Sequence, residues 1–301
     1  MKLHFRNLTK NDIPAILNIS KDIWEGDDYI PDVIERWINE KGNLAYGAFL
    51  EEEMKELIGF GRVKIFPNGL AWLEGGRVKV SHQKKGIGRD LMKYAIDYAI
   101  RVQAKVAQYD TSSRNFGSLS LAKFHGFKEK KRTEVLEADV SELKLKEYDF
   151  SDIRKISNKE AKEIYKIMDI GPGNELNIGW SYIPLTNLED KNSLWLTNSE
   201  AILQKIDIRS KVLPEKPREN WAWIIVYGEP KSASKLISYA ITHELNKDEI
   251  KIVAVYCQTE ALEYIKEMGF KNPSWEDEPV AVVLFEKDLR SNKIEKKEKK
   301  Y

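Results

Sequence analysis

The stretch Trp72-Leu73-Glu74-Gly75-Gly76-Arg77-Val78 leads through a short turn into Gln83-Lys84-Lys85-Gly86-Ile87-Gly88-Arg89, and it decides the fold. From residue 87 onward, apolar residues recur at the spacing of one helix face: Leu91, Met92, Ala95, Ile96 and Ala99. We therefore expect a strand over residues 71–80, a turn that contains glycine, and a helix over residues 87–103.

This turn has the composition of an anion site. Glycine lets a ligand approach the backbone, and the first amides of a helix have no intrahelical acceptor and lie at the positive end of its dipole. Lys84, Lys85 and Arg89 add positive charge. An ordinary strand-to-helix turn would share these features. A Walker loop and a dinucleotide fingerprint are both excluded, because Gly-Lys-Ser/Thr and a third glycine are missing.

The rest of the first half is typical of a mixed α/β domain. Pro67-Asn68-Gly69 predicts a hairpin between the strands on either side of it. We expect further strands near residues 2–8, 44–51, 56–66 and 105–111, with another pair within 127–140. Helices are expected near 11–24, 31–41 and 116–125.

Two internal similarities indicate tandem domains. Thr9 with Asp12, and Ser157 with Glu160, both have capping-box spacing at the start of a helical pattern. Each half also ends with a helix followed by Gly-Phe, at residues 126–127 and 269–270. We expect related domains over residues 1–145 and 146–290. The basic segment 291–301 is expected to be a disordered tail.

Composition narrows the class of protein. The 301 residues include 49 basic and 48 acidic side chains, so the net charge gives no argument for a nucleic-acid partner. Cys257 is the single cysteine, which excludes an intramolecular disulfide, and we expect it to be a buried hydrophobe. The histidines lack metal-ligand spacing, so no metal is expected. With no signal-peptide core and no apolar run of about 20 residues, we expect a cytoplasmic protein without a membrane partner; the oligomeric state stays open.

The turn resembles the Gln/Arg-x-x-Gly-x-Gly/Ala motif of the GNAT acetyltransferases. The resemblance covers nearly all of the first half, and Asn115, Gly126 and Phe127 keep the register of the family's Asn-x-x-Ala-x-x-x-Tyr-x-x-x-Gly-Phe segment. It implies a GNAT fold of the α/β class, with an α+β mixed sheet, and an acyl-CoA-dependent N-acetyltransferase whose cosubstrate is acetyl-CoA.

The resemblance also implies which residues bind the coenzyme. In the family the main chain around Val78 binds the pantetheine arm, and the Val78 N–H would polarise the thioester carbonyl. The coenzyme-binding residues that it implies are Gly76, Arg77, Val78, Gln83, Lys84, Lys85, Gly86, Ile87, Gly88, Arg89, Asn115 and Ser118.

Glu74 is the predicted catalytic base. A base is needed because the attacking amine is largely protonated at neutral pH, and many GNAT enzymes carry a glutamate at this place. The alternative is a carboxylate on an exposed strand face or one paired with Arg77. Where many family members have the tyrosine that protonates the leaving thiolate, this chain has Ala122. The proton donor could instead be Tyr109, His125 or water. No dedicated acid need exist, because a thiol with a pKa of about 8.5 is a fair leaving group near neutral pH.

The acceptor site is expected in Trp24-Glu25-Gly26-Asp27-Asp28-Tyr29-Ile30-Pro31. Glu25, Asp27, Asp28 and Tyr29 could hold a cationic amine or imidazole. A helix start would explain Pro31 but not the aromatics. This segment resembles the small-molecule branch of the family that includes vertebrate histidine N-acetyltransferase, which implies a free amino acid such as histidine as substrate.

The second half has no equivalent of the glycine-rich turn. Pro230 lies where the turn would be sought, so we expect a degenerate GNAT-like domain. Trp180, Trp195, Trp221 and Trp223 are more typical of core or interface aromatics than of a ligand cage. The leading hypothesis is direct acetyl transfer in a ternary complex. The alternatives are a non-catalytic acyl-CoA-binding sensor and a protein N-terminal or lysine acetyltransferase.

Overall fold

The chain forms two compact units that interleave along the sequence. The first unit comprises Met1–Asp110, Phe116–Glu129 and Phe285–Tyr301, and the second comprises Thr111–Asn115 and Lys130–Leu284. The sequential division expected at residue 145 differs from this, because residues 130–145 pack with the second unit and the end of the chain packs with the first. The computed structural model describes residues 2–23, 28–50, 56–168, 175–185, 193–206, 220–245 and 249–290.

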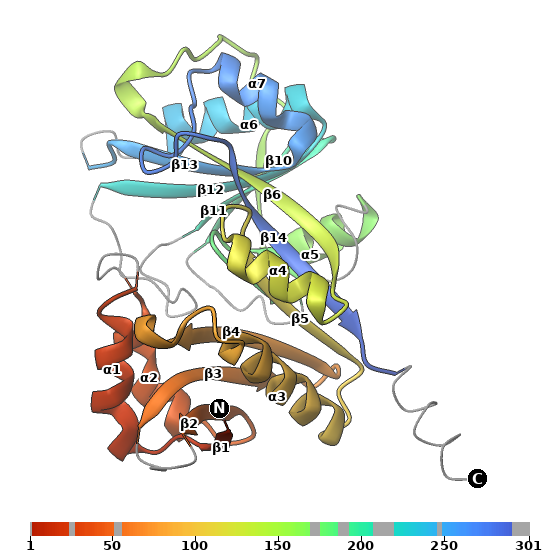
Figure 1. Cartoon of the computed structure of the whole chain (residues 1–301). Helices are drawn as coiled ribbons and strands as arrows, with labels where there is room; N and C mark the ends of the chain where they lie inside the picture. Colours follow the sequence, from red (N-terminus) through yellow and green to blue (C-terminus); the bar gives the residue numbers. More distant parts are fainter. Residues whose placement is uncertain are drawn as a thin grey trace. The chain divides into compact units, whose positions relative to one another are not determined.

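The first unit is built on a sheet in which the strands follow chain order (Figure 1). These are β1 (Leu3–Asn7), β2 (Leu44–Leu50), β3 (Leu57–Ile65), β4 (Leu70–Val78) and β5 (Val106–Ser112). The pairs from β1 to β4 are antiparallel, and β5 runs parallel to β4.

The end of the chain completes this unit. The last residues of β14 (Val280–Asp288) contact β5: the Gln108 side-chain amide donates to the Glu286 carboxylate at 2.7 Å, and the Tyr109 ring stacks on Phe285 with 5.5 Å between centroids. The sequence pattern did not predict this contact between β14 and β5, because the residues that it joins are more than 170 positions apart.

Helices cover both faces of the first sheet. On one face, α1 (Ile13–Ser20) and α2 (Ile30–Asn39) pack through a buried cluster that includes Ile16, Trp37 and Phe60. On the other face, α3 (Ile87–Arg101) lies against β3 and β4, and α4 (Phe116–Phe124) follows β5. The expected mixed α/β fold is confirmed. The pair of strands expected within 127–140 is wrong, because this segment forms one strand, β6 (Lys128–Asp139).

The local signals at helix ends are confirmed. The Thr9 N–H and hydroxyl donate to Asp12 at 2.8 and 2.9 Å, and the Ser157 N–H donates to Glu160 at 3.0 Å, so both capping boxes form. Gly126 and Gly269 end their helices with φ of +70° and +100°, where glycine costs less than other residues.

The second unit repeats the order of the first. Its strands lie in the order β6, β13, β12, β11, β10, β7, with β12 and β13 parallel and the other pairs in this series antiparallel. They are β7 (Arg154–Ile156), β10 (Leu194–Thr197), β11 (Ala201–Ile206), β12 (Trp221–Gly228) and β13 (Ile252–Cys257). The helices are α5 (Asn158–Ile167), α6 (Pro230–Tyr239) and α7 (Leu262–Glu267), and β8 (Glu175–Asn177) with β9 (Tyr182–Pro184) forms a separate hairpin.

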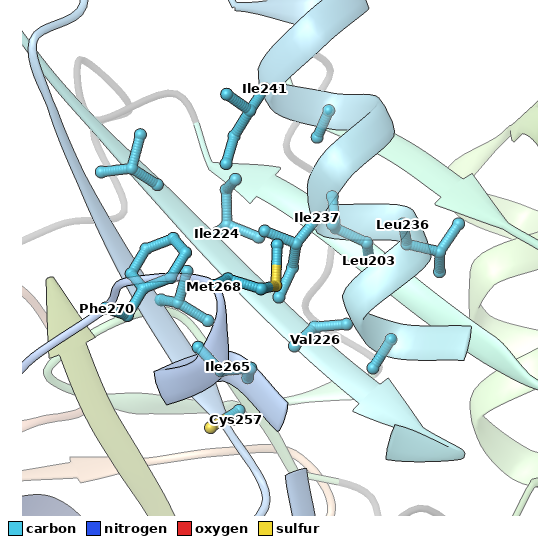
Figure 2. Close-up of a cluster of buried hydrophobic side chains, with 14 of the residues drawn as sticks. Leu203, Ile224, Val226, Leu236, Ile237, Ile241, Cys257, Ile265, Met268 and Phe270 are labelled. Atoms are coloured by element: carbon cyan, nitrogen blue, oxygen red, sulfur yellow. The ribbon is translucent and has the colours of Figure 1, made fainter. Parts of the chain in front are cut away.

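One face of the second sheet is aliphatic. Figure 2 shows Leu203 and Val226 of the sheet against Leu236 and Ile237 of α6. Cys257 lies in this cluster and is fully buried, as expected, and burial raises the pKa of its thiol. Full burial of one such aliphatic side chain stabilises the fold by about 1.5–3 kcal/mol. Within the described ranges, no helix combines the length and the apolar sequence needed to cross a membrane.

Candidate active site

The site begins at a bulge in β4. Phe60 faces Arg77 and Arg62 faces Glu74, so two steps along β3 correspond to three along β4. Gly75 accommodates the extra residue with φ of +66°, and a Cβ there would lie 2.5 Å from the Trp37 ring. A bulge redirects neighbouring side chains and leaves backbone groups unpaired, which places Glu74 at the point where the strand changes course.

Beyond Trp72, strands β4 and β5 separate. Their parallel pairing joins Leu70, Ala71 and Trp72 to residues 106–108, and within the described strands it goes no further although β4 continues to Val78. The Lys79 N–H donates to the Ile58 carbonyl of β3 at 2.9 Å. Because successive N–H groups of a strand point in opposite directions, the Val78 N–H points to the open side. Sites in α/β sheets commonly lie at the carboxyl ends of such strands.

The glycine-rich turn presents unpaired amides. Lys84 and Gly86 have φ of +59° and +87°, and α3 begins at Ile87. In the described part of the chain, the backbone N–H groups of residues 84–88 have no acceptor. A Cβ added at Gly86 or at Gly76 would meet nothing within 4 Å. The turn therefore has both the free donors and the open space that a pyrophosphate needs.

The side chains of the turn serve different purposes. Gln83 Nε2 donates to the Val78 carbonyl at 3.2 Å and Lys85 Nζ to the Ser81 carbonyl at 2.9 Å, so both brace the turn. Lys84 is exposed. The Arg89 guanidinium lies 4.3 Å from the centroid of the Phe124 ring on α4, directed at that helix.

The other predicted coenzyme residues are packed differently. Ile87 is buried, and a Cβ at Gly88 would make ordinary contact with Leu121 at 3.6 Å. The Ser118 carbonyl accepts a hydrogen bond from the Tyr109 hydroxyl at 2.9 Å. Asn115 belongs to the second unit, where its N–H donates to the Ser112 carbonyl at 3.0 Å.

Glu74 is paired with Arg62. The Arg62 guanidinium donates to the carboxylates of both Glu74 and Glu40, and its side chain is only 4% exposed. Burial raises the pKa of the Glu74 carboxyl above 4.5, against the opposing effect of Arg62. Sequence reasoning missed Arg62, although the register of the predicted hairpin places it directly opposite Glu74.

Arg77 pairs with Asp28 rather than with Glu74. Arg77 Nη2 and Nε donate to the two Asp28 oxygens at 2.8 and 3.0 Å, and Asp28 also accepts from the Ser20 hydroxyl and the Ile30 N–H. The Asp28 side chain is 1% exposed. This predicted acceptor residue is thus engaged by protein groups. Glu25 and Asp27 lie outside the described residues.

Tyr29 lies among the charged groups. Its ring is 5.4 Å from the Arg77 guanidinium and makes an edge contact with Trp37. Burial raises the pKa of the Tyr29 hydroxyl; Arg77 opposes this, and Glu74, Asp110 and Asp28 add to it. The sequence did not single out Asp110, an acid in β5 beyond the point where the strands separate. Its position after a buried parallel strand is the signal that could have identified it.

The proton-donor alternatives have distinct surroundings. Ala122 is 1% exposed within α4. Burial raises the pKa of Tyr109 to about 12, and its hydroxyl is bonded to Ser118. Burial lowers the pKa of His125, and the cations Lys287, Arg89 and Lys93 lower it further.

The equivalent junction of the second unit is closed by its own carboxylate. There β12 ends at Gly228 and α6 begins at Pro230, with Glu229 between them. The Glu229 carboxylate accepts from the Lys231 and Ser232 N–H groups at 3.0 and 2.6 Å. The first amides of this helix therefore already have an anionic partner.

Part of the first half of the chain matches a known protein family. Residues 13–127 match the model of the Acetyltransferase (GNAT) family. No curated protein sequence matches significantly.

Two solved structures resemble the whole chain. A GCN5-related N-acetyltransferase from Sphaerobacter thermophilus has a TM-score of 0.60 and 14% identity, with 96% of each chain covered. A GCN5-related N-acetyltransferase from Kribbella flavida has a TM-score of 0.56 and 10% identity, covering 96% of this chain and 72% of its own. At these identities the likeness establishes the fold alone.

Proposed function

We propose that the first unit transfers an acetyl group from acetyl-CoA directly to the amine of a small molecule. The observation that carries the proposal is the separation of β4 from β5 beside Glu74, with the free amides of residues 84–88 following β4. An open strand edge and an anion-binding turn are the two features that a long phosphorylated thioester requires.

Three parts of acetyl-CoA have matching groups. The amides of residues 84–88 are the donors for the pyrophosphate, and Lys84 adds charge. The main chain of Gly76, Arg77 and Val78 on the open side of β4 is the partner for the pantetheine arm. The Val78 N–H would donate to the thioester oxygen as negative charge develops there.

Glu74 would act as the base. It accepts a proton from the substrate ammonium, and the freed lone pair attacks the thioester carbonyl carbon. The nitrogen of the resulting tetrahedral intermediate gives up its second proton to solvent, the C–S bond breaks, and coenzyme A leaves as the thiolate. The raised pKa of Glu74 favours this role, because a base is most effective when its pKa approaches the working pH. With a thiol pKa of about 8.5, departure needs no dedicated acid, which fits Ala122.

The acceptor we infer is a compact cationic amine, such as the amino group of a free amino acid like histidine. Glu74 and Asp110 both act electrostatically on the Tyr29 hydroxyl, and two carboxylates near it favour a cation. Glu25 and Asp27 remain proposed contributors. A protein N-terminus or lysine is the alternative acceptor.

We also propose that the second unit is a degenerate GNAT-like domain. The repeated order of its strands and helices supports this relationship. Glu229, bonded to the first amides of α6, supports the loss of coenzyme binding there.

Turnover of acetyl-CoA with an amine panel tests the proposal. The full chain would be incubated with free amino acids including histidine, polyamines, and peptides with free N-termini or lysines, while thiol release is followed and products are identified by mass spectrometry. We expect amine-dependent release and an acetylated small molecule. Acetylated peptides alone would contradict the small-molecule acceptor, and binding without turnover would identify a sensor in which Ala122 marks lost chemistry.

A further inference from the structure

Three cations gather where α3, α4 and the end of β14 meet in the first unit. Helices α3 and α4 lie side by side (Figure 1), and the Arg89 guanidinium of α3 lies 4.3 Å from the centroid of the Phe124 ring of α4. Lys287 of β14 reaches the same place, because its Nζ lies 3.4 Å from a Cβ built at Gly126, just beyond α4. Lys93 is one helical turn after Arg89 on the same face of α3. We call Arg89, Lys93 and Lys287 the α3–α4 cation group.

His125 lies beside this group and responds to its charge. The His125 ring makes an edge contact with Phe124, with 5.0 Å between the ring centroids. Burial lowers the pKa of His125, and all three members of the cation group lower it further, because they disfavour another positive charge near them. The three cations therefore act on one place at the end of α4.

Two members of the group form no ion pair. In the part of the chain that the structure describes, neither Arg89 nor Lys287 has a carboxylate within salt-bridge distance. Lys93 pairs with Asp97 at 2.6 Å, but the two side chains are 66% and 47% exposed, and such a solvated pair contributes little stability. The charge of the group is thus available to an anion from solution.

The neighbouring acids are directed elsewhere. Glu286, next to Lys287 in β14, lies on the opposite face of the strand, because successive side chains alternate, and there its carboxylate accepts from the Gln108 amide at 2.7 Å. Asp90 follows Arg89 directly in α3, and adjacent positions of a helix do not face each other.

The cation group lies next to the proposed pyrophosphate site. Arg89 comes three residues after Gly86, a step of about 4.5 Å along the helix axis. Its guanidinium is held on the Phe124 ring, and a planar cation oriented in this way suits two parallel hydrogen bonds to a phosphate. Coenzyme A carries a third phosphate, on the 3′ oxygen of its ribose, and only the ribose separates that phosphate from the pyrophosphate. The coenzyme itself therefore supplies an anion at this distance from the turn.

We propose that the α3–α4 cation group binds the 3′-phosphate of coenzyme A and makes the first unit selective for coenzyme A over its 3′-dephospho form. Arg89 and Lys287 would pair with the phosphate oxygens, Lys93 would add charge, and Phe124 would orient Arg89. This inference rests on the proposed function, because it requires the pyrophosphate on the amides of residues 84–88. Those amides cannot provide this selectivity, since both forms of the coenzyme contain the pyrophosphate.

Titration calorimetry of the full chain with acetyl-CoA and with 3′-dephospho-acetyl-CoA tests this inference. The two ligands differ only in the 3′-phosphate, so the ratio of their Kd values isolates its contribution. We expect the wild type to bind acetyl-CoA about tenfold or more tightly, because charged hydrogen bonds commonly contribute that much. The preference should shrink at high ionic strength, because salt screens exposed charges.

Variants connect the preference to the proposed residues. Arg89→Met and Lys287→Met should each lower it about threefold or more by weakening the binding of acetyl-CoA alone. Phe124→Leu should act in the same direction, because Arg89 loses the ring that orients it. The matched control is Lys10→Met, an exposed lysine next to α1 on the opposite face of the sheet, which should leave the ratio unchanged.

Equal affinity of the wild type for the two ligands would overturn the inference and leave the proposed acetyl transfer intact. A preference that neither Arg89→Met nor Lys287→Met lowers would also overturn it, as would variants that weaken the binding of both ligands alike. A wild type that binds neither ligand would instead overturn the proposed coenzyme site, and this inference with it. Thermal melts establish that each variant folds.

Discussion

Arg62 on β3 donates a hydrogen bond to Glu74 on β4, and the same guanidinium holds Glu40. The two neighbours act on the Glu74 carboxyl with opposite sign: Arg62 lowers its pKa and Glu40 raises it, while burial, the largest effect, raises it. The protonation state of the proposed base is therefore set by residues outside the glycine-rich turn.

Replacing Glu74 by Gln should remove the base and leave the coenzyme site intact. We expect kcat to fall about 100-fold or more at neutral pH, because general bases commonly contribute that much, with partial recovery at high pH as free amine accumulates. Steady-state kinetics across pH, with acetyl-CoA affinity measured separately, checks this. If the variant turns over like the wild type throughout, Glu74 has a structural role.

The pH dependence should respond oppositely to the two partners of Glu74. Activity requires the carboxylate form, so it is lost as pH falls through the pKa of Glu74, which burial holds above 4.5. Glu40→Gln removes an influence that raises this pKa and should move the acidic limb of kcat/KM to lower pH. Arg62→Gln removes one that lowers it and should move the limb to higher pH.

Thermal melts of both variants would establish that they fold. If both substitutions move the acidic limb of kcat/KM in the same direction, or neither moves it, the limb reports the titration of a group other than Glu74.

Asp28→Asn should mainly lower the free energy of unfolding. The carboxylate is buried and pairs with Arg77 through two hydrogen bonds, so its replacement removes the charge paired with a mostly buried guanidinium, at a cost of about 3 kcal/mol. Urea unfolding measures this. Asp27→Asn, next to it in the sequence, is the matched variant for a direct acceptor contact and should raise KM for the amine about tenfold. A stable Asp28→Asn variant with a selective rise in amine KM would contradict the structural role.

Local chemistry made much of the first unit predictable. Gly86 precedes α3 and has the left-handed backbone conformation that glycine favours. Pro67-Asn68-Gly69 joins β3 to β4 as expected. These features depend on neighbouring residues, so the sequence pattern contains them. The capping pairs Thr9–Asp12 and Ser157–Glu160 were predictable for the same reason.

Features that depend on distant residues were not predictable. Arg62 is 12 positions from Glu74 and 22 from Glu40, and its role requires the hairpin register and the end of α2 together. The contact of Phe285 with Tyr109 joins residues that are far apart in the sequence. The expectation that Asp28 faces a substrate rested on composition, and composition does not reveal that Arg77 is its partner.

Acetyl-CoA binding at the glycine-rich turn is the most direct test of the central claim. Gly86→Ala/Gly88→Ala should lower affinity in titration calorimetry about 30-fold or more, because methyl groups would obstruct the approach of the pyrophosphate to the amides. Gly42→Ala is the matched control for backbone strain, since Gly42 has φ of +82° and Gly86 has φ of +87°, and an added Cβ meets nothing within 4 Å at either position. The account predicts that the wild type and Gly42→Ala bind acetyl-CoA alike while the double variant does not; a double variant that binds as tightly as the wild type, or a wild type that does not bind, would contradict it.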